Sequence, residues 1–276
     1  MMPEESLEGL SLKCGPLGEH DRLLTLLSEE GGLSRLAVPG ARRPRSSLAA
    51  AVPLSQLRLQ VGGGRGLRRV RQLRVIHNFS QLGQRLEALA AAQSLAELCL
   101  RLVPDGDGVA GALDDLTLQL RRLESVVSER QDSLEALAIA VQGHVHLLAL
   151  GGYGLPLQRC ARSGEPLAPP LGNRDWRCSL LPSEGLVIGS VAGAMLVLNA
   201  SELALLQRLP RPGLPRCRDG SLMGPAWVWL RLLGLVQVWC QEHLGCRGKA
   251  LGLLQGCFSS VSQGHHGAAP SLAPND

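Results

Sequence analysis

The first 78 residues carry short runs in which apolar and polar positions partly alternate, the pattern of half-buried β-strands. Residues that favour turns separate these runs, which lie at 7–14, 23–27, 33–38, 52–61 and 67–76. Five short strands can bury their apolar faces by closing into a small barrel. The five-stranded oligonucleotide-binding (OB) barrel is the leading candidate.

From residue 81 the apolar positions recur at helical spacing instead. Leucines at this spacing continue as far as Pro104, and two further helices are predicted at 113–127 and 133–150. The pattern therefore predicts an α+β protein. An N-terminal five-stranded OB-type barrel at 1–80 precedes a mainly α-helical domain at 81–258.

The region after the third predicted helix is irregular. Residues 151–200 are rich in Gly and Pro and include a possible hairpin from Leu186 to Leu198. A short helix is expected at 202–209, with Asn199 or Ser201 as its cap.

The most apolar stretch of the chain, at 225–240, predicts a buried helix that ends near Gly245. It is too short to span a membrane. We expect Trp227, Leu230 and Val238 to be among its buried positions.

Positive charge is concentrated in the first domain. Eleven arginines and no acidic residue lie between Gly31 and Leu86, which leaves 17 of the 28 basic residues against all 24 acidic residues elsewhere. A cationic segment on an otherwise acidic chain predicts a surface for a polyanion. A basic face that served only solubility would normally mix both signs, so nucleic acid is the favoured partner.

Three of these arginines surround a proline in the loop GARRPRS at 40–46. Residues 1–78 contain no aromatic side chain on which a base could stack, since the first is Phe79. We therefore expect the barrel to bind phosphates by charge, without reading the base sequence. The candidate DNA-binding residues are Arg22, Arg35, Arg42, Arg43, Arg45, Arg65, Arg68, Arg69, Arg71 and Arg74.

The last predicted strand carries four of these candidates. Arg68 and Arg74 have one parity along the strand, whereas Arg69 and Arg71 have the other. A regular strand cannot point all four to the same side.

The opening sequence EGLSLKCGPLGEHDRLLTLLSEEGGLSRLAVPGARRPRS resembles the amino-terminal domain of the bacterial RecO family of recombination mediators. The shared features include Glu19, Asp21 and Arg22, the EEGG turn and the GARRPRS loop. LLALGGYGLPLQRC and VWCQEHLG, further along the chain, fit the same family. The resemblance covers residues 7–255.

The resemblance implies a cytoplasmic, nucleoid-associated DNA repair and recombination protein that is not an enzyme. It implies binding to single- and double-stranded DNA, annealing of complementary strands, and loading of RecA, together with RecR, onto strands coated by single-strand-binding protein. In that family the acidic C-terminal tail of the single-strand-binding protein docks on the helical domain. Barrel and charge alone leave open a basic RNA-binding or ribosome-associated protein.

Motifs for a cofactor or a metal do not stand out. The glycine-rich VGGGRG lacks the ending of a phosphate-binding loop and precedes a strand. His144 and His146 lie two apart on a predicted helix, so they face different directions and cannot chelate one ion. We expect no cofactor.

Members of the RecO family commonly carry a zinc site of two CxxC pairs, which the resemblance places in the 151–200 segment. Cys160 keeps one thiol, whereas Ser163, Gly189 and Ala192 stand at the other three positions. With Cys178 as the only further candidate, four thiolate ligands are not available. We therefore expect a degenerate zinc-finger-like insertion without metal.

The ends of the chain and its cysteines indicate in which compartment the protein resides. The N-terminus is acidic without an apolar core, so no signal peptide is expected. Eight irregularly spaced cysteines favour free thiols in a reducing cytoplasm. The polar tail at 259–276 is expected to be disordered, and no membrane contact is expected.

Overall fold

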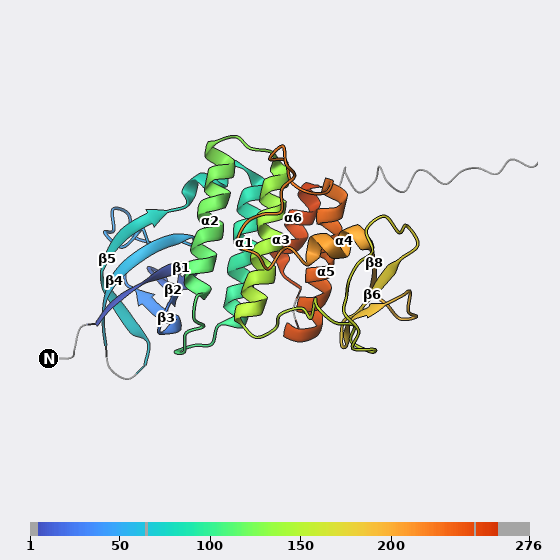
Figure 1. The fold of residues 1–276 in the computed structure, drawn as a ribbon. Helices are drawn as coiled ribbons and strands as arrows, with labels where there is room; N and C mark the ends of the chain where they lie inside the picture. The colour runs from blue at the N-terminus through green and yellow to red at the C-terminus, as the bar shows by residue number, and fades with distance from the viewer. Residues whose placement is uncertain (1–4, 64–65, 246, 259–276) are drawn as a thin grey trace, which may run out of the picture.

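The computed structural model of the chain describes residues 5–63, 66–245 and 247–258, so the tail predicted to be disordered lies outside the described residues. The N-terminal part is a closed barrel in the order β1-β2-β3-β5-β4, in which β4 pairs back with β1 (Figure 1). The strands are β1 Glu5–Leu17, β2 Asp21–Ser28, β3 Gly32–Val38, β4 Ser55–Gly62 and β5 Arg68–Asn78. The predicted OB-type barrel, followed by helices, is confirmed.

One wall of the barrel packs against the helices through a row of three leucines. Leu10 pairs with Leu27, and Leu27 pairs with Leu33, across β1, β2 and β3. All three belong to the buried cluster that the helices form. Leu24 and Leu26 belong instead to the separate cluster inside the barrel. Because β2 is buried on both faces, its sequence LLTLL is almost continuously apolar rather than alternating.

A β-bulge in β1 determines which residues lie next to the leucine row. The pairing with β2 shifts between Ser11 and Lys13, so that Leu12 is an extra residue. Leu12 therefore joins the helical core, while Lys13 lies beside it, exposed and paired with Thr25. Without the bulge, Lys13 would have the parity of Leu7, which packs inside the barrel.

A second bulge corrects the parity argument for β5. Val61 pairs with Val70 but Gln60 pairs with Gln72, so that Arg71 is the extra residue. Val70 is buried inside the barrel, while Arg69 and Arg74 are both exposed. The bulge offsets the alternation, and arginines of opposite parity share the outer surface.

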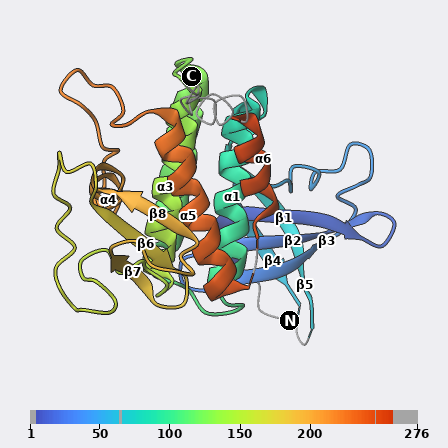
Figure 2. The same ribbon diagram turned by 90° about the vertical axis from the view of Figure 1, so that its right-hand side faces the viewer.

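A bundle of helices follows the barrel and separates it from a small sheet at the other end of the molecule (Figures 1 and 2). The helices are the 3₁₀-helix η1 Ser80–Gln84, α1 Leu86–Leu102, α2 Ala112–Ser128, α3 Ser133–Leu150, α4 Ala200–Leu206, α5 Ala226–Leu244 and α6 Lys249–Cys257. The three helices predicted after residue 81 are all present. Helix α6, which only four residues separate from the end of α5, was not predicted.

The loop between α1 and α2 is joined to the turn between β2 and β3 by backbone hydrogen bonds. The Leu33 amide donates to the Pro104 carbonyl (3.0 Å), and the Gly106 amide donates to the Leu33 carbonyl (3.1 Å). Gly32 has a φ of 54°, and a Cβ there would lie 2.1 Å from the Asp107 carbonyl oxygen. The EEGG turn therefore needs its second glycine for this close approach.

The segment at 151–200 contains a three-stranded sheet rather than a hairpin. Strand β6 (Arg177–Leu181) lies between β7 (Gly185–Ile188) and β8 (Leu196–Asn199), and both pair with β6 rather than with each other. The predicted hairpin is therefore wrong, because β6, the central strand of the sheet, was not predicted. Asn199 caps α4, and its side chain and that of Glu202 bond each other's backbone amides.

Helix α5 begins after Pro225 and ends at Gly245, which has the left-handed conformation expected of a helix stop. The predicted buried positions of α5 are wrong. Trp227, Leu230 and Val238 are only partly buried, whereas Trp229 and Leu232 are fully buried. Sequence periodicity alone did not identify which side of this nearly all-apolar helix packs on α3.

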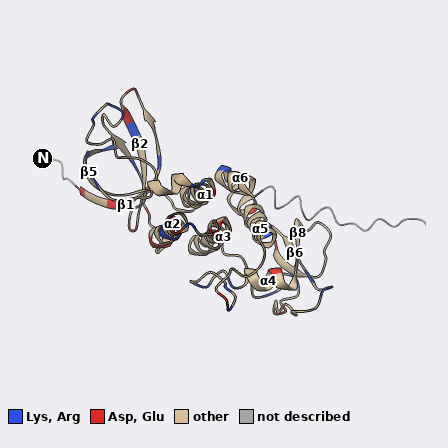
Figure 3. Ribbon diagram, turned by 90° about the horizontal axis from the view of Figure 1, so that it is seen from above, with Lys and Arg blue, Asp and Glu red and all other residues tan. Residues whose placement is uncertain are grey.

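Within the described residues, α3 is long and apolar enough to cross a membrane, but most of it is buried inside the protein. It lies between α1, α2 and α5 and forms the centre of the bundle (Figure 3).

A buried polar network ties α2 and α3 to the segment after α4. Nδ1 of His146 lies 3.1 Å from the Asp115 carboxylate, and Nε2 lies 2.8 Å from the Leu209 carbonyl. Gln142 donates from its side-chain amide to three carbonyls of the same segment, at Leu209, Arg211 and Gly213. Since both acceptors of His146 lack a proton, only the imidazolium can donate to both.

We predict that Leu232→Ala lowers the free energy of unfolding by about 2–5 kcal/mol, because it leaves a cavity in the core. Leu230→Ala, at a partly buried position of the same helix, is the matched control and should cost clearly less. Urea denaturation of both variants measures the difference. Equal losses would mean that the two faces of α5 are packed alike.

We also predict that His144 and His146 change the stability of the protein in opposite directions as the pH rises. Burial lowers the pKa of His146, but the bonds to Asp115, Leu209 and Arg211 outweigh it and raise the pKa above 6.5. The stability that His146 contributes is therefore complete below pH 6.5 and is lost as the pH rises through the higher folded pKa. Burial lowers the pKa of His144 to about 4, so that stability falls as the pH drops from 6.5 towards 4.

The unfolding midpoint of the protein and of His146→Gln, measured between pH 5 and 8, tests this. The substituted protein should lose the decline above pH 6.5 and keep the decline below it. A decline above pH 6.5 that persists in His146→Gln would contradict the assignment.

Candidate nucleic-acid interface

The loop GARRPRS is built on ordered turns at one end of the barrel. The Gly40 amide donates to the Asp21 carboxylate (2.7 Å), and the Arg42 amide donates to the His20 carbonyl (2.9 Å). Ala41 and Leu48 are buried in the barrel cluster. The barrel therefore holds the backbone of the loop, through Ala41 within it and Leu48 just after it.

The arginine side chains of this loop face outward. Arg42, Arg43 and Arg45 are all exposed. The Arg42 side chain contacts the Gly18 carbonyl at 3.3 Å, while the side chains of Arg43 and Arg45 form no ion pair or hydrogen bond with another described residue. Three adjacent cations on a fixed backbone, without acidic partners, are suited to an external anion.

The other candidate DNA-binding arginines differ in the groups that their side chains contact. Arg22 donates to the Ala49 and Ala51 carbonyls (3.0 and 2.9 Å), so it anchors the segment after the loop rather than facing a ligand. Arg65 lies outside the described residues. Arg74 is exposed, and its side chain forms no ion pair or hydrogen bond with the residues that the structure describes.

Three further candidates form ion pairs with acidic residues. Arg35 lies 3.4 Å from Asp105, Arg69 lies 3.7 Å from Asp21, and Arg68 pairs with Glu5. Exposed pairs of this kind contribute little to stability. Arg35 and Arg69 are each 63% exposed, so a phosphate could replace either acidic partner at small cost. Arg71 lies against Gly62, where a Cβ would meet its guanidinium.

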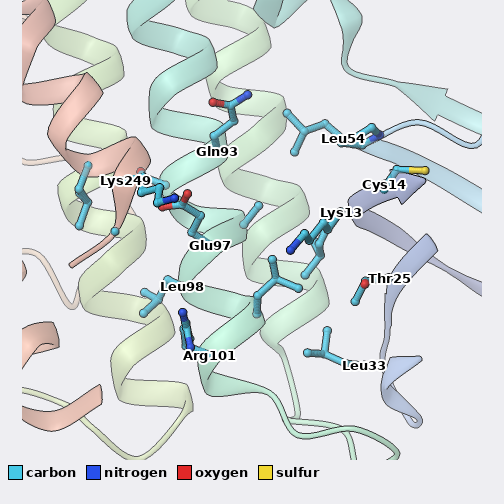
Figure 4. A pocket seen from close by; sticks show the side chains of 18 of the residues that line it. Lys13, Cys14, Thr25, Leu33, Leu54, Gln93, Glu97, Leu98, Arg101 and Lys249 are labelled. Atoms are coloured by element: carbon cyan, nitrogen blue, oxygen red, sulfur yellow. The ribbon is translucent and has the colours of Figure 1, made fainter. Parts of the chain in front are cut away.

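The structure also reveals a cleft that the sequence did not indicate, between the barrel and the helices. Its volume is about 930 Å³. The barrel wall contributes the cross-strand row Lys13, Thr25 and Arg35, two strand positions beyond Leu27 and Leu33 of the leucine row. Figure 4 shows Lys13 extending from this wall, with Glu97, Arg101 and Lys249 on the helical side.

The cations of this cleft come from distant parts of the chain. They are Lys13, Arg35, Arg101, Arg247 and Lys249. None stands in a basic run except Arg35, so counting charge in a sequence window could not find them. The local signal was the bulge that places Leu12 and Lys13 on the helix-facing side of β1, and the sequence did not predict that bulge.

The two parts of the predicted zinc-finger-like insertion do approach each other, around one cysteine. The Ile188 amide donates to Cys160 Sγ at 3.4 Å, and the Ala161 amide donates to the Leu186 carbonyl at 2.8 Å. Burial raises the pKa of Cys160, but hydrogen bonds from Ser163, Ile188 and Arg162 outweigh it and lower the pKa to about 7. The described part of the chain contains no group of three or more potential metal ligands.

Comparison with known proteins shows the family. The model of the family described as "Recombination protein O N terminal" matches residues 2–79, and that of "Recombination protein O C terminal" matches residues 83–251. The chain is 60% identical over 266 residues to "DNA repair protein RecO" of Prochlorococcus marinus (strain MIT 9303), covering 96% of this chain and 99% of that protein.

More distant relatives agree. "DNA repair protein RecO" of Synechococcus sp. (strain WH7803) is 58% identical over 267 residues, covering 96% of this chain and 99% of that protein. The protein of the same name from Trichodesmium erythraeum (strain IMS101) is 30% identical over 275 residues, covering 92% and 94%. With its OB-type barrel and helical bundle, this chain belongs to the RecO family of DNA repair proteins.

We predict that the purified protein contains well under one zinc per chain. Cys160 is the only thiol at the four positions where the family's zinc ligands are expected, and a tetrahedral site needs four ligands. Elemental analysis after dialysis measures the content. A stoichiometric zinc that resists chelators would overturn this prediction.

Proposed function

We propose that this protein is a non-enzymatic recombination mediator in the cytoplasm, associated with the nucleoid. It binds single- and double-stranded DNA, anneals complementary strands, and with RecR helps to load RecA onto strands coated by single-strand-binding protein. Membership of a DNA repair family supports the process. The acidic C-terminal tail of the single-strand-binding protein is proposed to dock on the helical part.

The observation that carries the DNA-binding proposal is the loop at 40–46. Arg42, Arg43 and Arg45 are exposed on a backbone that the barrel holds in place, and no acidic residue neutralises them within the described chain. Guanidinium groups bind phosphate oxygens in a forked geometry. Because the barrel contains no aromatic residue before Phe79, binding rests on the backbone of the nucleic acid and not on base stacking.

We predict that replacing Arg42, Arg43 and Arg45 with Ala leaves the fold intact, because all three side chains are exposed. Affinity should fall equally for every DNA sequence, since phosphate contacts carry no base information. The slope of log K against log [salt] should flatten by roughly 2 for single strands and roughly 3 for duplexes, at about 0.7 and 0.9 per lost contact.

A matched variant keeps this test specific. Arg121, Arg174 and Arg218 are exposed arginines of the helical part, and their replacement by Ala removes the same net charge. This control should leave both slopes unchanged. If the loop variant also left them unchanged, the loop would not be the DNA surface, and an acidic protein would be its more suitable partner.

Annealing distinguishes the proposal from RNA binding or a ribosomal role. The protein should speed the pairing of complementary DNA strands, and the loop variant should slow it towards the rate without protein. Tight RNA binding without any annealing of DNA would favour the alternative.

A further inference from the structure

We propose that the cleft between the barrel and the helices is a second binding site for the sugar–phosphate backbone, one that accepts a single strand and excludes a duplex. This inference deepens the proposed function and rests on it. The loop at 40–46 would hold either form of DNA, whereas only an unpaired strand would continue from the loop into the cleft.

The charge of the cleft supports an anionic ligand. Four of its cations, Lys13, Arg101, Arg247 and Lys249, are exposed, and their side chains form no ion pair or hydrogen bond with another described residue. Its two acidic residues are both engaged. Asp105 pairs with Arg35, and Glu97 accepts the Ala250 amide (3.0 Å) at the start of α6. The acidic groups thus hold the walls together and leave a cationic surplus between them.

Most leucines of the cleft are buried. Leu12, Leu33, Leu54, Leu98 and Leu251 line it, but each is less than 10% exposed. A ligand therefore meets the exposed cationic side chains together with the partly buried Leu23 and Leu100. This favours a charged backbone over a peptide that must bury apolar side chains.

The cleft continues towards the arginine loop along the outer face of the barrel. Gly15 and Leu23 pair with each other beyond the row of Lys13 and Thr25, and both line the cleft. Two positions further along β2 lies Asp21, whose carboxylate holds the Gly40 amide of the loop. Four strand positions separate Thr25 from Asp21, roughly 13 Å, a span that a few nucleotides can cover.

The size of the cleft separates a strand from a duplex. The volume of about 930 Å³ suits a short length of one strand. A duplex, whose major groove alone is about 12 Å wide, carries a second strand for which this volume leaves no room. A single backbone has no such limit. On the helical wall, Gln93, Glu97 and Arg101 share one face of α1 at four-residue spacing.

The test is the variant Lys13→Ala, Arg101→Ala, Lys249→Ala, compared with the loop variant and the Arg121, Arg174, Arg218 control. Binding to a single-stranded oligothymidylate and to a duplex is measured as a function of salt. The cleft variant should lower the single-strand slope by roughly 2, which is about a hundredfold in affinity at 0.1 M salt when binding at 1 M is unchanged. Its duplex slope should stay that of the unaltered protein.

The loop variant should lower both slopes, so the two surfaces are told apart. An unchanged single-strand slope in the cleft variant, or an equal loss for duplex, overturns the inference while the proposed function stands. If the loop variant changed neither slope, the loop at 40–46 would not be the DNA interface. The slopes of the cleft variant would still test the cleft independently. If the triple Ala variant does not fold, the corresponding Gln substitutions test the same charges with longer side chains.

A polyglutamate peptide is the final probe, because a cationic cleft could instead hold an acidic protein segment. The inference expects the peptide to bind far more weakly than the oligothymidylate and to be displaced by it. Peptide binding that is lost in the cleft variant, with single-strand binding unchanged, would make the cleft a protein-docking site and overturn the inference.

Discussion

The packing of the leucine row Leu10, Leu27 and Leu33 against the helices is the constraint on which the arrangement of this protein depends. It gives β2 two buried faces and removes one wall of the barrel from solvent. The backbone bonds between Leu33 and the loop after α1 fix the two parts at the same edge. Polar and charged groups of the barrel are therefore restricted to the remaining walls, to the loop end, and to the cleft that begins where the leucine row stops.

Ion pairs with acidic residues decide which arginines of the barrel are available to bind an external anion. The chain places Glu5, Glu8, Asp21 and Asp105 beside arginines of the barrel, at Arg68, Arg58, Arg69 and Arg35. All four acids lie outside the acid-free window at 31–86, three of them before it and the fourth, Asp105, in the helical part. The number of arginines in the sequence thus overstates the cationic surface, because acidic residues distant in the chain return to it in the fold.

The sequence predicted the barrel and the first three helices because their apolar periods are regular and their turns carry glycine or proline. It failed where one residue breaks the period. The bulge at Leu12 turns Lys13 outward, and the bulge at Arg71 places Arg69 and Arg74 on one surface, although their parities differ. The cleft could not be predicted at all, since Lys13 and Lys249 meet only through the docking of the two parts. The fully apolar α5 likewise gave no period from which its buried face could be chosen.

The arginine loop is ordered without a ligand, and this lowers the entropy that binding would cost. Mutual repulsion of three guanidinium groups would favour an extended, mobile segment, but the Asp21 carboxylate holds the Gly40 amide and Ala41 is buried at the barrel end. The barrel thus supplies the free energy that keeps the cations close together. A phosphate backbone that binds here does not have to order the loop, so less of the interaction energy is lost to chain entropy. The phosphate site proposed for this loop would rely on charge without base stacking, and preorganised cations reduce what such a site loses to chain entropy.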